Sequence, residues 1–305
     1  MTASLDRRRF LGGSLLGGCA LLAGAQQTAS AAESEKPAPA ATPTLPKLKK
    51  AAVIGMLSAK LSFEDRFKLA RDVGFEGVEA DTVDDPKTVE AMRAAAGKAG
   101  LAIHSIMNSN HWDCPLSSPD PKKVAAGLRG METSLRNAKA FGADTVLLVP
   151  GVVTSETRYA DAYERSQAEI KKLLPLAAEL GVVIAIENVW NRFLLSPLEF
   201  ARYVDEFQSP ALRAYFDVGN IVQYGYPEDW IRTLGKRIVK VHIKDFDRRM
   251  NRFAALYEGS VNWPVVRRAL AEVGYSGWIT AELPGGDEKY LRDVASHVDM
   301  IIAGE

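Results

Sequence analysis

The sequence predicts a single (β/α)8 TIM-barrel domain, and three observations lead to that fold class. Short, β-branched apolar runs alternate with helical segments at a spacing of roughly 30 residues, the period of a βα unit. Several expected helices end in a glycine, as in KAGL, AFGAD and ELGV, which is a common way to close a helix before the next strand. Eight such units close a barrel, whereas an open doubly wound sheet would favour a GxGxxG sequence after the first strand, which this chain lacks.

The expected strands are continuous apolar runs, which is typical of parallel strands that are covered on both faces. They cover residues 51–56, 77–80, 101–107, 144–150, 182–187, 212–217, 238–244 and 277–282. The expected helices cover residues 63–73, 86–98, 122–141, 160–180, a segment that begins after Ser196 and Pro197, 227–235, 263–273 and 287–302. Long loops follow the third and the seventh strands.

Residues 1–32 are predicted to be a twin-arginine signal peptide. DRRRFLGG is followed by SLLGGCALLAGA, a basic stretch before a short apolar one. The apolar stretch of ~15 residues is shorter than a membrane-spanning helix requires, so we expect no stable membrane span in the mature protein. The leader predicts a periplasmic or extracytoplasmic location. A lipid anchor on Cys19 is a minority alternative, because Gly17 is uncommon at its place in such a motif.

Residues 33–50 are rich in proline and alanine and are expected to form a disordered linker, which leaves a catalytic domain at 51–305. The net charge of zero argues against a nucleic acid partner. Only Cys114 remains once the leader is removed, so we expect no intramolecular disulfide. The oligomeric state stays open, a homo-oligomer being one outcome.

Four side chains stand at or near the ends of four successive expected strands. They are Glu187, Asp217, His242 and Glu282. Because the carboxyl ends of TIM-barrel strands carry the active site, we expect these side chains to meet at one rim. Three carboxylates and one imidazole suit one divalent ion such as Mn or Mg, with Co or Zn as alternatives.

Side-chain alternation supports this interpretation, because it places Lys240, His242 and Lys244 on one face of their strand. Glu79, at the end of the second strand, is a weaker candidate for the same rim. His104 on the third strand either faces the barrel mouth or belongs to the core.

Five segments resemble the sugar isomerase/epimerase superfamily of xylose-isomerase-like barrels. They are IENVWNRF (186–193), FDVGN (216–220), VHIKDFDRR (241–249), YEGSVNW (257–263) and TAELPGG (280–286). The superfamily includes D-tagatose 3-epimerase, L-ribulose-5-phosphate 3-epimerase and hydroxypyruvate isomerase, and the resemblance spans about residues 51–302. It implies that the four strand-end residues hold the metal and that Glu187 and Glu282 are also the catalytic acid/base pair.

The resemblance also implies that Arg248 binds substrate, because an arginine at this place does so in the ketose epimerases. Trp112, on the loop after the third strand, would stack on a sugar ring or close the site, or would anchor that loop to the barrel surface. The full predicted substrate-binding set is His104, Trp112, Asn220, Lys244, Arg248 and Glu258. Asn220 stands where the ketose epimerases often have histidine, and Leu194 where they have glutamate. The family pattern therefore supports the metal site better than it supports a particular substrate.

The implied reaction is proton abstraction next to a carbonyl of a keto-sugar, giving an enediolate. Return of a proton to the other face would make an isomerase or epimerase. Loss of a β-leaving group would instead make a 3-keto-glycoside lyase or hydrolase. We expect a non-phosphorylated sugar or glycoside, because Asp287 and Glu288 follow the glycines that could bind phosphate.

Two other classes of protein are alternatives to an enzyme of this kind. A DNA-repair endonuclease of the same superfamily needs a trinuclear zinc cluster rich in histidine, and this chain has four histidines and no net charge. A non-catalytic carbohydrate-binding barrel would be expected to lose an acid/base residue, and both glutamates are present.

Overall fold

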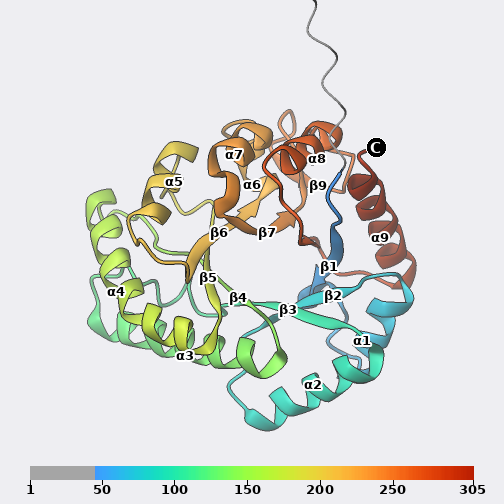
Figure 1. The fold of residues 1–305 in the computed structure, drawn as a ribbon, viewed down its shortest axis with the longest axis horizontal. Coiled ribbons are helices and arrows are strands. Elements are labelled where there is room, and N and C mark those ends of the chain that lie inside the picture. The colour runs from blue at the N-terminus through green and yellow to red at the C-terminus, as the bar shows by residue number, and fades with distance from the viewer. Residues whose placement is uncertain (1–44) are drawn as a thin grey trace, which may run out of the picture. The chain divides into compact units, whose positions relative to one another are not determined.

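A computed structural model describes residues 45–305 and confirms the predicted fold. Eight parallel strands close a barrel in the order β1-β10-β7-β6-β5-β4-β3-β2, and helices surround it (Figure 1). The barrel strands are β1 (Lys49–Val53), β2 (Gly77–Asp81), β3 (Ala102–Met107), β4 (Thr145–Leu148), β5 (Val183–Glu187), β6 (Leu212–Asp217), β7 (Ile238–Ile243) and β10 (Trp278–Ala281).

The helices follow the expected segments closely. They are α1 (Phe63–Asp72), α2 (Pro86–Ala99), α3 (Pro121–Phe141), α4 (Tyr159–Leu180), α5 (Pro197–Asp205), α6 (Val218–Val222), α7 (Pro227–Leu234), α8 (Trp263–Glu272) and α9 (Glu288–Ala303). Two short 3₁₀ turns, η1 (Ile54–Met56) and η2 (Gly235–Arg237), lie between these elements.

Helix α3 illustrates why the helix ends could be read from the sequence. The side chain of Asp120 accepts a hydrogen bond from the backbone N–H of Lys122 at 2.8 Å, and Pro121 occupies the first helical position. Such a cap stabilises a helix by about 1 kcal/mol. Gly142 ends the helix with φ of 76°, a left-handed conformation that glycine adopts without strain.

The barrel begins earlier than the expected boundary at residue 51. Lys49 and Lys50 pair in register with Trp278 and Ile279, so β1 includes the last two residues of the segment expected to be a linker. The predicted leader and residues 33–44 lie outside the described part of the chain. Within residues 45–305, none of the helices combines the length and apolarity that crossing a membrane requires.

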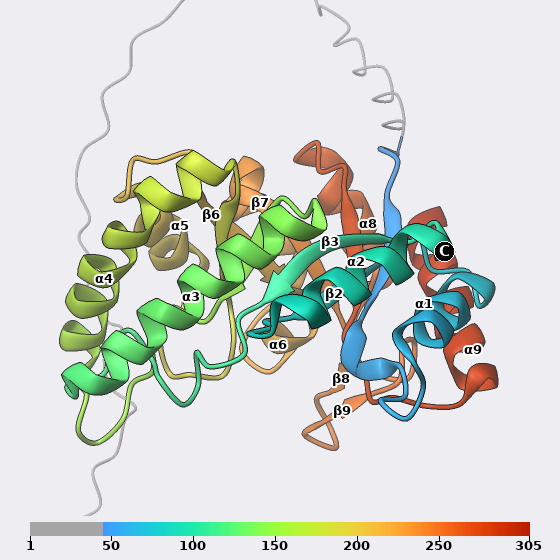
Figure 2. The ribbon, with the colours of Figure 1, turned by 90° about the horizontal axis from the view of Figure 1, so that it is seen from below.

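Two small elements were not expected from the sequence. Helix α6 is a single short turn after β6, and β8 (Asp245–Asp247) pairs antiparallel with β9 (Arg252–Ala254) inside the long loop after β7. Figure 2 shows this β8–β9 hairpin standing out from the barrel near α6.

The fully buried carboxylate of Asp245 anchors this loop. It accepts hydrogen bonds from the backbone N–H groups of Tyr257 and Val261, each at 3.1 Å, and from Trp263 Nε1 at 3.2 Å. A Cβ at Gly259 would lie 2.0 Å from Asp245 Oδ1, so the close passage of the chain requires glycine there.

Candidate functional site

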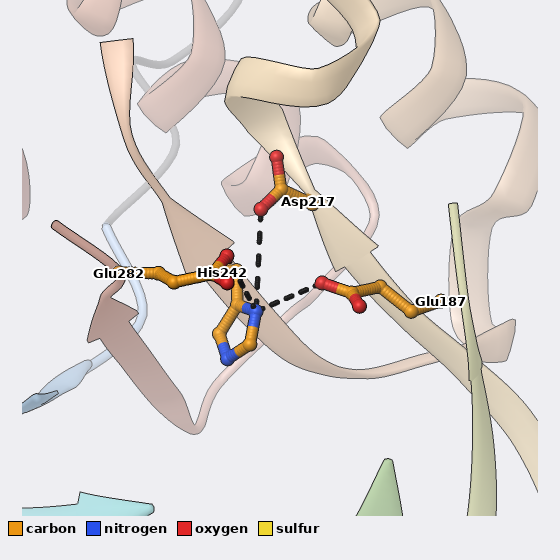
Figure 3. Close-up of side chains that lie close together, drawn as sticks. All are labelled: Glu187, Asp217, His242 and Glu282. Atoms are coloured by element: carbon orange, nitrogen blue, oxygen red, sulfur yellow. Dashed lines mark hydrogen bonds and ion pairs between the residues drawn. The ribbon is translucent and has the colours of Figure 1, made fainter. Parts of the chain in front are cut away.

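The four strand-end residues meet at one rim of the barrel. One ligand atom from each of Glu187, Asp217, His242 and Glu282 lies within 4.8 Å of the others, and we call these four residues the metal cluster (Figure 3). They come from β5, β6, β7 and the residue after β10, which are consecutive neighbours in the barrel. The strand register places Asp217 and Thr280 beside His242, one on each neighbouring strand. Because side chains alternate along a strand, Glu282 points to the same side as Thr280, so the cluster side chains point the same way.

His242 is the fully buried centre of the cluster. Its Nδ1 lies 2.9 Å from Glu187 Oε1, 3.3 Å from Glu282 Oε2 and 4.0 Å from Asp217 Oδ2. Figure 3 shows Glu187 and Glu282 reaching the ring from opposite sides. The Nδ1 atom is therefore the histidine nitrogen that faces the position a cation would take.

The other nitrogen of His242 contacts Glu79, which the sequence offered only as a weaker candidate. His242 Nε2 lies 3.0 Å from Glu79 Oε1. Glu79 Oε2 accepts a hydrogen bond from the Tyr215 hydroxyl at 2.6 Å and another from Ser105 Oγ. These contacts fix both the carboxylate and the histidine ring, as is common for partners of metal-binding histidines.

Asp217 supplies the observation that tests whether a cation fits. Its Oδ1 accepts a 2.6 Å hydrogen bond from the backbone N–H of Asn220, which caps α6. Its Oδ2 is buried and has no hydrogen-bond partner, although the Lys244 amine lies 3.1 Å away as an ion pair. A buried carboxylate oxygen that accepts no hydrogen bond is costly, and a cation in the cluster would add to the single ion pair with Lys244. The donor set thus fits a divalent ion.

The charges of the metal cluster are strongly coupled. Burial raises the pKa of Glu187 to about 7, although His242 opposes the rise. Burial also raises the pKa of Asp217 to about 6, and the Lys244 charge opposes it. Burial alone would raise the pKa of Glu282, but His242 and Lys244 outweigh it and hold that pKa below its usual range. When a divalent ion binds, its charge would replace the protons that neutralise these carboxylates in the metal-free protein.

Two of the predicted substrate-binding residues lie at the metal cluster. The Lys244 amine is 2.6 Å from Glu282 Oε2, which places it between two cluster carboxylates. Asn220 is buried, and its side chain donates to the carbonyl of Asn188 at 3.0 Å. Its contacts position the loops after β5 and β6.

His104 and Trp112 lie elsewhere. His104 is buried in the barrel, stacked on Trp278 at 4.7 Å between ring centroids, with Nε2 3.1 Å from Thr280 Oγ1. Trp112 is half exposed on the loop after β3 and lines a separate cavity of about 380 Å³. No hydrogen bond or ion pair joins either residue to the metal cluster within the described chain.

Arg248 and Glu258 are likewise placed apart. The Arg248 guanidinium donates to the backbone carbonyl of Val222 at 2.7 Å and to that of Gly225, and it lies over the Tyr226 ring. These bonds tie the loop after β7 to the segment after α6. Glu258 is exposed.

Asn188 is a site residue that sequence reasoning missed. Its Oδ1 accepts from the backbone N–H of Asp217 at 2.9 Å, and its Nδ2 donates to the carbonyl of Asp217 at 2.8 Å. This pair of bonds fixes the backbone of one cluster residue against the strand that carries another. The signal was its position directly after Glu187 in the IENVWNRF segment.

Comparison with known proteins decides the family. Residues 67–299 match the family described as the xylose isomerase-like TIM barrel. This chain belongs to that family. The predictions of the family and of an enzyme are confirmed.

Several proteins that are similar to this chain are named as epimerases. A 2-epi-5-epi-valiolone 7-phosphate 2-epimerase of Actinoplanes is 29% identical over 58% of this chain and 66% of its own length. An L-ribulose-5-phosphate 3-epimerase of Escherichia coli is 26% identical over 75% of this chain and 87% of its own. The structure of a 3-keto-D-glucoside 4-epimerase from Escherichia coli superposes with a TM-score of 0.72 and 16% identity, over 84% of this chain and 99% of that one.

Proposed function

We propose that this protein is a divalent-metal-dependent sugar isomerase or epimerase that removes a proton next to the carbonyl of a keto-sugar. The observation that carries the proposal is the metal cluster itself, in which two glutamates approach His242 from opposite sides (Figure 3). Glu187, Asp217, His242 and Glu282 would hold one ion, with Mn, Mg, Co and Zn as candidates. When bound, a divalent ion draws electrons from a substrate carbonyl and acidifies the adjacent C–H bond.

The two glutamates would move the proton. One carboxylate takes it from the carbon next to the carbonyl and leaves an enediolate, and the other returns a proton to the opposite face. Burial raises the pKa of Glu187 to about 7 when no metal is bound, and the charge of a bound cation would lower it. Glu282 is kept anionic by His242 and Lys244, so it would begin as the acceptor. Lys244 would also stabilise negative oxygen on the substrate.

A neutral sugar fits the rim better than a sugar phosphate. A cavity of about 520 Å³ between the loops after β1 and β10 is lined by Arg66, Asp81, Gly285 and Gly286. Arg66 Nη2 already donates to the carbonyls of Ile54 and Leu57, at 2.9 and 3.1 Å. The Asp81 carboxylate would repel a phosphate there, so we propose a non-phosphorylated keto-sugar or keto-glycoside as substrate.

Cleavage of a 3-keto-glycoside is the second candidate. The first step is the same, but the electron pair of the enediolate expels the aglycone oxygen from the β-carbon in place of accepting a proton. The predicted twin-arginine leader favours this candidate, because sugar phosphates are cytoplasmic metabolites. A relative named for a 3-keto-D-glucoside is compatible with such a substrate. We propose export through the leader, and a homo-oligomeric state stays open.

Solvent deuterium separates the two outcomes. The protein is loaded with one metal at a time and incubated in D₂O with D-fructose or D-tagatose, and separately with a 3-keto-glucoside. Deuterium at the carbon next to the carbonyl without loss of aglycone supports the isomerase or epimerase, and aglycone release supports the lyase. No deuterium uptake and no release with any of the four metals would reject proton abstraction.

A further inference from the structure

Two large aromatic side chains lie stacked and exposed beside the metal cluster. Trp190, on the loop after β5, is 41% exposed, and Phe253, in β9, is 45% exposed. Their ring centroids are 4.9 Å apart and their planes differ by 21°. Such a pair leaves a broad apolar surface in water, which commonly marks a binding site.

Both rings are held in place. Trp190 Nε1 donates to the carbonyl of Asn220 at 2.9 Å, and its ring meets the fully buried Phe246 edge-on at 5.5 Å. Phe253 is paired with Phe246 across the β8–β9 hairpin, which stands near α6 in Figure 2. A fixed ring loses little conformational entropy when a ligand stacks on it.

Lys244 lies between the aromatic pair and the metal cluster. The Lys244 amine lies 5.2 Å from the Phe253 ring centroid and 2.6 Å from Glu282 Oε2. This amine already pairs with Glu282 and Asp217, so its charge is compensated and does not select an anion. A ligand that reached past Lys244 would therefore meet apolar rings.

We propose that Trp190 and Phe253 form a subsite for the aglycone of a glycoside, and that the subsite favours an aromatic aglycone. This inference rests on the proposed function for the sugar end of the ligand and extends it to the second group that the substrate carries. A flat ring can stack on the exposed aromatic surface, whereas a methyl group covers little of it.

The test is a binding measurement that needs no turnover. Ligand-observed NMR titrations of the full chain loaded with Mg²⁺ compare 4-nitrophenyl β-D-glucopyranoside with methyl β-D-glucopyranoside, neither of which carries a ketone. We expect the aryl glucoside to bind about two- to tenfold more tightly. Phe253→Ala should abolish the difference, and Phe253→Trp should retain it. Leu198→Ala is the matched control, since Leu198 is an apolar residue of α5 that is 74% exposed.

The inference is overturned if the wild-type protein shows no preference, or if the preference survives Phe253→Ala. Sedimentation velocity on the same samples tests the rival occupant. An oligomer that Phe253→Ala dissociates would make this surface an interface between copies of the chain. Absence of proton abstraction would reject the proposed function but would leave this result intact, because the probes do not react.

Discussion

His242 turns one ring nitrogen to Glu79 and the other to the metal cluster. The Nε2–Oε1 distance to Glu79 is 3.0 Å, and Nδ1 lies 2.9 Å from Glu187 Oε1. Both carboxylates are buried, and the Tyr215 hydroxyl and Ser105 hydroxyl hold Glu79. Burial opposes a charge on His242, but the charges of Glu79 and Glu282 outweigh it and raise its pKa well above the usual value, so both ring nitrogens carry protons when no metal is bound. When a cation replaces the proton on Nδ1, Glu79 would keep the proton on Nε2 and so hold the ring in the state that a metal ligand requires.

Replacing Glu79 should weaken metal binding without removing a ligand of the metal cluster. In Glu79→Gln the charge that favours a proton on Nε2 is lost, and we expect a 10- to 100-fold rise in the metal dissociation constant. Titration calorimetry with Mn²⁺ measures it, and circular dichroism checks the fold. Glu64→Gln, an exposed glutamate in α1, is the matched control. Equal metal affinity in Glu79→Gln and the wild type would contradict the positioning role.

The metal cluster could be predicted from the sequence, and Glu79 was a weaker candidate for the same rim, but the contacts of Glu79 with His242 and Tyr215 could not be predicted. Glu187, Asp217 and Glu282 each follow a buried run, and parallel strands bring such ends together. Glu79 meets Tyr215 across 136 positions, a contact that only barrel closure creates. The β8–β9 hairpin could not be predicted, because the Asp245 carboxylate holds its loop and no apolar pattern marks it in the sequence. The early start of β1 depends in the same way on its pairing with Trp278.

Metal affinity should fall as the pH falls from about 8 to 5. Burial raises the pKa of Glu187 to about 7 and that of Asp217 to about 6, so both carboxylates take up protons in this range when no metal is bound. Because a ligand must lose its proton to bind the ion, the dissociation constant should rise below pH 7 and more steeply below pH 6. Calorimetry in two buffers of different ionisation enthalpy should also detect proton release at pH 6. An affinity that is constant from pH 5 to 8 would show that these carboxylates do not bind the metal.

The Asn188 side chain should contribute to both the stability of the protein and its metal binding. It bonds both the N–H and the carbonyl of Asp217, so Asn188→Ala leaves two backbone groups without these partners and frees the Asp217 backbone. We expect a loss of about 1–3 kcal/mol in the free energy of unfolding of the metal-free protein and weaker metal binding. Urea denaturation and calorimetry measure the two effects. Asn262→Ala, which removes the N-cap hydrogen bond of α8 but no hydrogen bond to the metal cluster, is the control that should lower stability without changing metal affinity.

The twin-arginine leader makes a separate prediction about location. Arg7→Lys together with Arg8→Lys keeps the positive charge but removes the paired arginines of the DRRRFLGG sequence. If the leader directs twin-arginine export, cell fractionation of the bacterial host should find the double variant retained in the cytoplasm. Replacement of Cys19 by Ala should leave export and solubility unchanged unless a lipid anchor is attached there. Equal export of the double variant and the wild type would reject the assignment.

Replacing Glu187 or Glu282 by glutamine should change deuterium exchange with different epimers of the substrate. If they serve opposite faces of the enediolate, Glu282→Gln should lose deuterium exchange with one epimer and keep it with the other, and Glu187→Gln should show the reverse. We expect each lost activity to fall by about 10²–10⁴-fold, the usual contribution of a general acid or base. Metal content must be measured on both variants, because an amide is a weaker ligand than a carboxylate. Metal-loaded Glu282→Gln with unchanged turnover of every keto-sugar would rule out a proton-transfer role for Glu282. If both metal-loaded variants instead lose exchange with both epimers, a single-base mechanism with one glutamate as a ligand alone would replace the two-face mechanism.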